Sequence, residues 1–92
     1  MDEPLREADA RQLIRRILED GSVLASEHAA REMAADELTM PDCFSVLRAG
    51  WIEPPEFENG SWRYRVMTQK VVVVVAFMSE SELLVVTAWR KK

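Results

Sequence analysis

The run Val71–Met78 limits the possible folds of this chain more than any other feature. It is eight consecutive apolar residues, most of them β-branched, and that composition favours a β-strand. A strand that is apolar on both faces is expected at the centre of a sheet, covered on both sides over at least part of its length. It is far shorter than the roughly 20 apolar residues of a membrane-spanning helix.

Two further segments on either side of this run predict strands. Residues 62–67 alternate apolar and polar side chains, which is typical of a half-exposed strand. Residues 83–89 predict a third strand after a polar turn at 79–82. The links at 68–70 and 79–82 are short, so the three strands are expected to form an antiparallel meander.

The first half of the chain predicts helices. Residues 8–20 place their apolar side chains at helical spacing. Ser26 is suited to cap a second helix, and Thr39 with Asp42 resembles the capping box of a third that ends at Gly50. The stretch between the first two helices is expected to be only an extended link. The pattern predicts an α+β domain with N-terminal helices packed on a small antiparallel sheet.

Length and composition narrow the class of protein. The 92 residues make one domain, residues 1–92, and 48% hydrophobic residues argue against intrinsic disorder. Cys43 is the only cysteine, so no disulfide forms within the chain, and we expect it in the core. One histidine and one cysteine without spaced partners predict no metal site, and the three isolated glycines predict no phosphate loop or cofactor. The acidic N-terminus does not resemble a secretory signal, and a cytoplasmic protein that is not in a membrane is expected.

The charges are unevenly distributed along the chain. The net charge is −4, but residues 61–92 carry six basic and two acidic side chains, whereas residues 21–60 carry two and eight. A basic face formed by the last third would suit a polyanion. Alternatively, these charges only keep a valine-rich sheet in solution, and a pI near 5 is unusual for non-specific nucleic-acid binding.

Three positions are candidates for chemistry with a phosphodiester. His28, the only histidine, lies near the start of the second predicted helix and can accept or release a proton near neutral pH. Arg63 and Arg65 point to the same face of their strand, about 7 Å apart, a span that suits a phosphodiester. The alternatives are a surface histidine without a role and arginines that solvate an outer face.

Aromatic residues supply further candidates. Trp89 precedes Arg90 and two lysines, a cluster that can stack a base and hold its phosphates, or else anchor the chain terminus. Tyr64 is expected to point away from the two arginines, toward the core. Trp51 is interpreted as covering the edge of the core rather than as a second stacking surface.

The order of these features resembles a known group of proteins. The helix segment Ser26–Met33, the pair Tyr64–Arg65 and the ending Val85–Lys91 resemble an uncharacterised bacterial family of the RelE/ParE toxin superfamily. The chain is also similar to the MqsR toxins. The resemblance implies the toxin of a bacterial toxin–antitoxin system, held inactive by a cognate antitoxin, that cleaves mRNA as an endoribonuclease without metal or cofactor. Residues that match the motifs are His28, Arg31, Tyr64, Arg65 and Thr87.

This interpretation assigns roles in a transesterification. His28 would transfer the proton, while Arg65, with Arg31 or Arg63, would stabilise the phosphorane and Thr87 would complete the catalytic group. The residues expected to bind substrate are Arg63, Tyr64, Trp89 and Arg90. The alternatives are a non-enzymatic protein-interaction module and a non-nuclease toxin, such as a gyrase inhibitor, on the same fold. Catalysis requires that the imidazole and the guanidinium groups share one accessible face.

Overall fold

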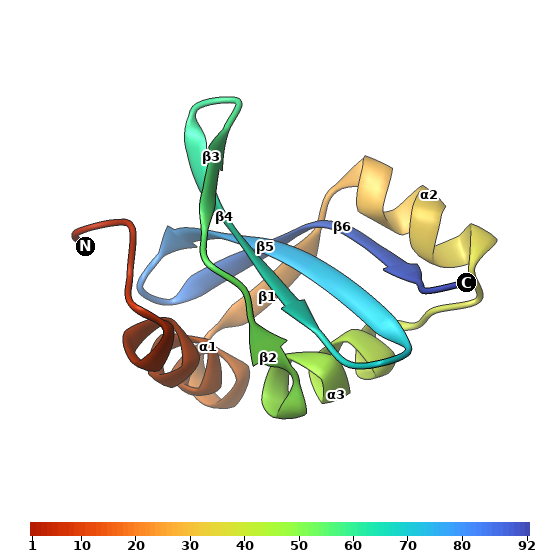
Figure 1. The fold of residues 1–92 in the computed structure, drawn as a ribbon, viewed down its shortest axis with the longest axis horizontal. Coiled ribbons are helices and arrows are strands. Elements are labelled where there is room, and N and C mark those ends of the chain that lie inside the picture. Colours follow the sequence, from red (N-terminus) through yellow and green to blue (C-terminus); the bar gives the residue numbers. More distant parts are fainter.

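A computed structural model describes residues 1–92 and shows helices packed on a single sheet (Figure 1), which confirms the predicted α+β class. The helices are α1 (Glu7–Asp20), α2 (Glu27–Ala35) and α3 (Met40–Ala49). The strands are β1 (Ser22–Ala25), β2 (Trp51–Ile52), β3 (Glu56–Glu58), β4 (Ser61–Met67), β5 (Val71–Ser79) and β6 (Glu82–Arg90).

The sheet has six strands, and its main path runs β1-β6-β5-β4-β2, with β3 paired to β4 beside this path. The valine strand β5 lies at the centre, as its two apolar faces predict, and β4, β5 and β6 form the expected antiparallel meander. The segment expected to be only a link instead forms β1, which pairs in parallel with β6. Four residues are too few to show a strand period, so this pairing had no local signal.

Side-chain caps hold the starts of α2 and α3. The Ser26 hydroxyl accepts a hydrogen bond from the Ala29 amide and donates one to the Val86 carbonyl, each at 3.0 Å, which ties α2 to β6. The Thr39–Asp42 capping box is present. Hydrogen bonds from the Thr39 amide and hydroxyl hold the pKa of the Asp42 carboxyl below its ordinary value.

The main core lies between one face of the sheet and the helices α1 and α3, which both lie below the sheet in Figure 1. Its fully buried side chains include Ile14, Ile17, Cys43, Leu47, Tyr64, Val66, Val73, Val75, Leu83 and Val85. Burial raises the pKa of the Cys43 thiol to about 11, with a smaller contribution from the neighbouring Asp42. The apolar stripes of α1 and α3 therefore face this layer. In α2 the expected stripe of Ala30, Met33 and Ala34 is only partly right, because Ala29 and Met33 are the buried residues and the other two are exposed.

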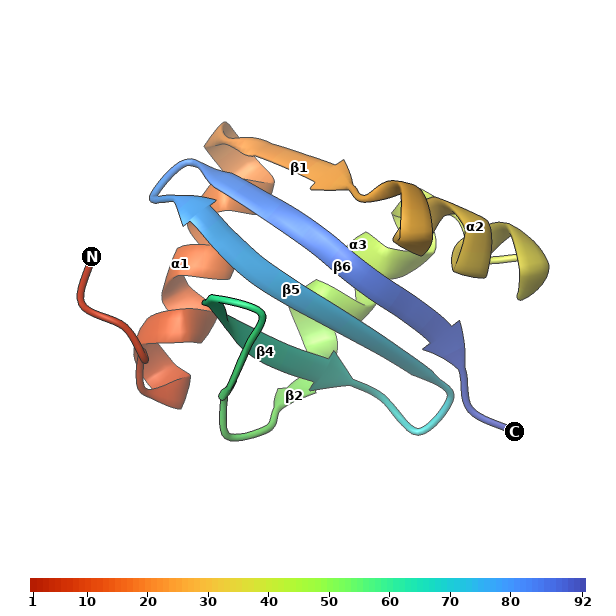
Figure 2. The ribbon, with the colours of Figure 1, turned by 90° about the horizontal axis from the view of Figure 1, so that it is seen from above.

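The opposite face of the sheet carries no layer of helices, and we call it the open face (Figure 2). Helix α2 borders it beside β6, and the β3–β4 hairpin rises from it at the other side (Figure 1). Val72, Val74 and Ala76 of the central strand point toward this face and are each less than 9% exposed. Their burial comes from side chains of the neighbouring strands, so the open face has an apolar floor between two raised borders.

Candidate functional site

A β-bulge determines which side chains of β6 reach the open face. Val74 pairs with Thr87 and Val75 pairs with Val85, so Val86 is the extra residue. Before the bulge, Val85 faces the core and is fully buried. Without the bulge, the alternation of a strand would turn Thr87 to that same face, whereas the bulge turns it to the open face.

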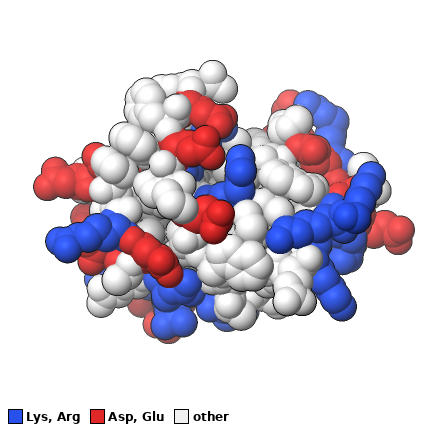
Figure 3. Space-filling view, viewed as in Figure 1, with Lys and Arg blue, Asp and Glu red and all other residues white.

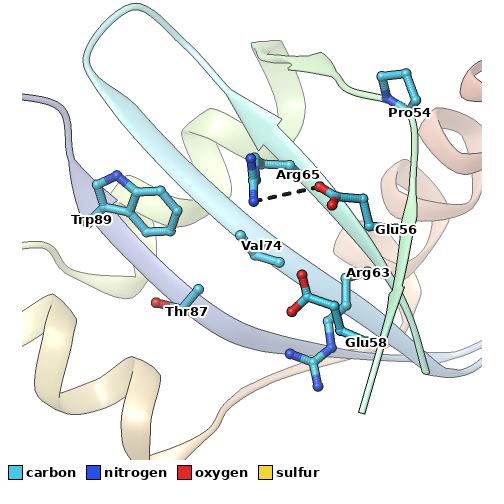
Figure 4. A pocket seen from close by; sticks show the side chains of 8 residues that line it. All are labelled: Pro54, Glu56, Glu58, Arg63, Arg65, Val74, Thr87 and Trp89. Carbon is cyan, nitrogen blue, oxygen red and sulfur yellow. Dashed lines mark ion pairs between the residues drawn. The ribbon is translucent and has the colours of Figure 1, made fainter. Parts of the chain in front are cut away.

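One row of paired residues crosses the open face at this point. Arg65 of β4 pairs with Val74 of β5, which pairs with Thr87 of β6. Paired residues in a sheet point to the same side. Neighbouring strands are about 4.8 Å apart, which places the backbones of Arg65 and Thr87 about 10 Å apart. A hollow of about 90 Å³ lies over this row and also contacts Arg63 and Trp89 (Figure 4).

Two carboxylates of the β3–β4 hairpin face the arginines across the hollow. Glu56 Oε1 lies 3.7 Å from Arg65 Nη2, and Glu58 also lines the hollow (Figure 4). Both partners of the ion pair are substantially exposed, so the pair contributes little to stability. Arg63 Nε donates to the Ser61 hydroxyl at 3.2 Å. Neither guanidinium is buried, and both remain accessible to an anion.

Helix α2 places the histidine at the other border of the open face. His28 is the second residue of α2, and its Nε2 lies 2.6 Å from Glu32 Oε1, one helical turn away. The same carboxylate oxygen accepts a hydrogen bond from the Thr87 hydroxyl of β6. The His28 side chain is 63% exposed. Glu32 therefore connects the imidazole to the row that ends at Thr87.

Sequence reasoning did not identify Glu32 as a site residue. The signal was present as the i,i+4 spacing of His28 and Glu32, which places both side chains on one helix face. That face was not known to border the sheet, because α2 packs against a strand more than 50 residues away in the sequence. The hairpin carboxylates Glu56 and Glu58 were missed for the same reason.

The structure brings four of the predicted residues to one hollow on the open face: Arg63, Arg65, Thr87 and Trp89. His28 lies at the border of this face and is joined to Thr87 through Glu32. Tyr64 is not among them, and the prediction that it contacts a substrate is wrong. It is fully buried on the opposite face, where its hydroxyl donates to Glu3 Oε2 and accepts from the Leu5 amide. Burial, with the Glu3 carboxylate, raises its pKa to about 12.

Arg31, another predicted residue, lies elsewhere on the surface. Arg31 is exposed on the side of α2 away from its buried residues Ala29 and Met33, and no ion pair involves it. Its guanidinium therefore does not reach the row at Arg65 in this structure.

Arg90 has a structural role that the sequence did not indicate. Its Nε donates to the Asp36 carbonyl at 2.9 Å, and its Nη2 donates to the Glu37 carbonyl at 3.2 Å. The Arg90 amide also donates to Asp36 Oδ2. These bonds satisfy carbonyls just after α2 and favour a positive charge at that helix end. The guanidinium is thus occupied by the protein, although it borders the open face.

Trp51 was expected to cover the edge of the core, because it lies beside the proline loop. The structure instead places it on the open face. Its side chain is 43% exposed, and Lys91 Nζ lies 5.1 Å from the centre of its ring. The neighbouring Ile52 is the residue of β2 that points into the core.

Comparisons with family models, curated proteins and solved structures give no match to this chain. The structure contains no group of three or more histidine, cysteine, aspartate or glutamate side chains placed to hold a metal ion. None of the three helices combines the length and the apolar character that crossing a bilayer requires.

Proposed function

We propose that the protein cleaves single-stranded RNA by transesterification, without a metal ion. The observation that carries this proposal is the exposed imidazole of His28, which Glu32 links to Thr87 at the border of the open face that carries Arg63 and Arg65. The reaction needs a proton acceptor, positive charge near the phosphorus and access for an extended chain. The hollow on the open face holds Arg63 and Arg65, and the imidazole lies at the border of that face, joined to Thr87 of the hollow through Glu32.

His28 is the proton-transfer group in this proposal. Its Nε2 proton is donated to Glu32, which leaves Nδ1 as the acceptor nitrogen. Nδ1 takes the proton of a ribose 2′-hydroxyl, and the oxygen attacks the adjacent phosphorus. The 5′-oxygen leaves and takes up a proton from the imidazolium or from water. The products are a 2′,3′-cyclic phosphate and a 5′-hydroxyl, so no water is consumed and no oxidant is needed.

Arg65 stabilises the charge that develops on the phosphoryl oxygens, with Arg63 beside it. One hydrogen-bond donor of this type contributes about 3–4 kcal/mol to transition-state stabilisation in well-studied enzymes. A bound phosphate would displace the weak contact between Arg65 and Glu56, which is exposed on both sides. Trp89 lines the same hollow and offers a ring on which a neighbouring base can stack.

The biological setting proposed for this activity is a bacterial toxin–antitoxin pair with mRNA as the target. This part rests on the motif resemblance of the segments around His28, Arg65 and Thr87. One structural observation supports it: Arg65 and Thr87 line one hollow, and the His28 helix is bonded to Thr87 through Glu32, although the three segments are far apart in the sequence. An antitoxin would inhibit such an enzyme most directly by covering the open face.

The test is cleavage of a long single-stranded RNA by the pure protein in EDTA. We expect 2′,3′-cyclic phosphate ends, and a loss of rate of at least about 100-fold in His28→Ala, the usual scale for general acid–base catalysis. Arg65→Ala should show a loss of similar size. Arg16→Ala, on the exposed side of α1, is the matched control and should keep the wild-type rate. Intact RNA with the wild-type protein, together with no growth defect on expression, would contradict the proposal.

A protein-interaction module remains the second candidate, and the exposed edge of β1 favours it. β1 pairs only with β6, and its Leu24 side chain is 51% exposed. An unpaired edge can accept a strand from a partner protein. Under this alternative, Leu24→Lys would abolish binding to the partner, whereas His28→Ala would leave both partner binding and biological effect unchanged.

A further inference from the structure

A second row of paired residues crosses the open face next to the one described above. Trp51 pairs with Met67, Met67 pairs with Val72, and Val72 pairs with Trp89. All four side chains therefore point to the open face, and we call them the tryptophan row. Three strand spacings separate the two tryptophans, which is about 14 Å between their backbones.

The tryptophan row is most accessible at Trp51 and is buried at Val72. Trp51 is 43% exposed and Trp89 is half-buried, whereas Val72 is only 3% exposed. One exposed ring and one half-buried ring, on either side of an apolar floor, offer two surfaces for flat, apolar groups. Neither indole is needed to close the main core, which lies on the other side of the sheet.

Unpaired cations surround the same end of the sheet. Lys91 Nζ lies 5.1 Å from the centre of the Trp51 ring, and the Lys91 amide donates to the Lys70 carbonyl at 2.8 Å. None of Lys70, Lys91 and Lys92 forms an ion pair. Basic side chains gather at this end of the molecule, where the chain terminates (Figure 3). Positive charge is therefore available here, although Glu32 and Asp36 line the same hollow as Lys91 and Lys92.

The tryptophan row is continuous with the candidate catalytic groove. Trp89 lines the hollow that contains Arg65 and Thr87, and it also lines a second hollow of about 410 Å³ with Lys91 and Lys92. Lys91 in turn reaches the Trp51 ring. A chain bound at the first hollow would thus continue over Trp89 toward Trp51 without leaving the open face.

We propose that the tryptophan row is a binding subsite for single-stranded RNA, in which Trp51 and Trp89 each stack one base and Lys70 and Lys91 contact the phosphates between them. This inference rests on the proposed function, which supplies RNA as the ligand. It assigns a binding site to the nucleotides that flank the cleaved bond. Accessible aromatic rings with lysines beside them match unstacked bases on a phosphate backbone. A duplex keeps its base faces stacked and would not use the rings.

The test measures binding without cleavage. A fluorescently labelled RNA oligomer with 2′-O-methyl riboses lacks the attacking hydroxyl, so its binding does not depend on catalysis. We expect Trp51→Ala to weaken binding about 5- to 150-fold, the range found for removal of one stacking ring. Trp51→Phe should retain most of the affinity, because a ring remains. Phe57→Ala is the matched control, since Phe57 is an exposed ring on the hairpin outside the row.

The lysines are tested in the same assay against a matched arginine on α1. Lys91→Gln should weaken binding and lower its dependence on salt, whereas Arg16→Gln should change neither. Equal affinities of Trp51→Ala and Phe57→Ala would overturn the inference, even if the protein cleaves RNA. Equal binding of duplex and single strand would also overturn it. Normal binding by the tryptophan row without any cleavage would instead refute the proposed function and leave the subsite intact.

Discussion

The Thr87 hydroxyl of β6 donates a hydrogen bond to Glu32 Oε1 of α2, the oxygen that also contacts His28. This bond joins a strand to a helix across 55 residues of sequence. It fixes the turn of α2 that carries the imidazole against the end of the row formed by Arg65, Val74 and Thr87. The position of the only histidine thus depends on a side chain of the sheet.

Replacing Thr87 by valine removes this bond and keeps the shape of the side chain. We expect the rate of RNA cleavage to fall about tenfold, because Glu32 loses one of the two groups that hold it. The free energy of unfolding should fall by about 1 kcal/mol, the usual contribution of one hydrogen bond. Thr87→Ser keeps the hydroxyl and is the control. It should retain most of the cleavage rate and most of the free energy of unfolding. Full activity in Thr87→Val would show that the bond does not position the histidine.

Replacing Glu56 by glutamine removes the carboxylate that lies 3.7 Å from Arg65. We expect RNA to bind a few-fold more tightly at low salt, because the phosphate no longer competes with an anion. Stability should change by less than about 0.5 kcal/mol, since the ion pair is exposed on both sides. Glu80→Gln, in the turn before β6, makes the same change of charge elsewhere and should not alter binding. A similar gain in both variants would mean that only net charge matters.

Removing the Arg90 side chain should reduce stability more than RNA binding. Its guanidinium donates to the carbonyls of Asp36 and Glu37 at the end of α2. We expect Arg90→Ala to lower the free energy of unfolding by about 1–2 kcal/mol, measured by urea denaturation. Lys92→Ala, which removes a nearby charge without such bonds, is expected to leave stability unchanged. An unchanged stability in Arg90→Ala would contradict the structural role.

Alkaline pH should destabilise the protein through Cys43. Burial raises the pKa of its thiol from the ordinary 9.0 to about 11, so the unfolded chain loses the proton at lower pH than the folded one. The free energy of unfolding should therefore fall between pH 9 and pH 11, by about 2 kcal/mol from this group. Cys43→Ala should reduce this fall. The buried Tyr64 acts in the same direction at higher pH, between pH 10 and about 12.

Tests of the Cys43 prediction combine denaturation with thiol labelling. In the folded protein at pH 8, Cys43 should react slowly with a thiol reagent, because it is fully buried and protonated. Urea should make it reactive. A fall in stability between pH 9 and pH 11 that is equally steep in Cys43→Ala would show that other groups cause it.

Much of the fold was predictable because its signals are local. The apolar run of β5 required a central strand. Ser26 predicted the start of α2, and Thr39 and Gly50 predicted the two ends of α3, as the structure shows. The candidate site was predicted less completely. Tyr64 and Arg90 were assigned to substrate, but Tyr64 belongs to the core and Arg90 to the end of α2.

The sequence by itself determined the helices, the central strand and the uneven distribution of charge, because spacing along a short segment decides each of them. Only the tertiary structure decided that β1 pairs with β6, that the bulge at Val86 turns Thr87 to the open face, and that α2 brings His28 beside it. These relationships join segments that are distant in sequence. A pairing register or a one-residue bulge leaves no period in the sequence, since it depends on which partner strand the chain meets.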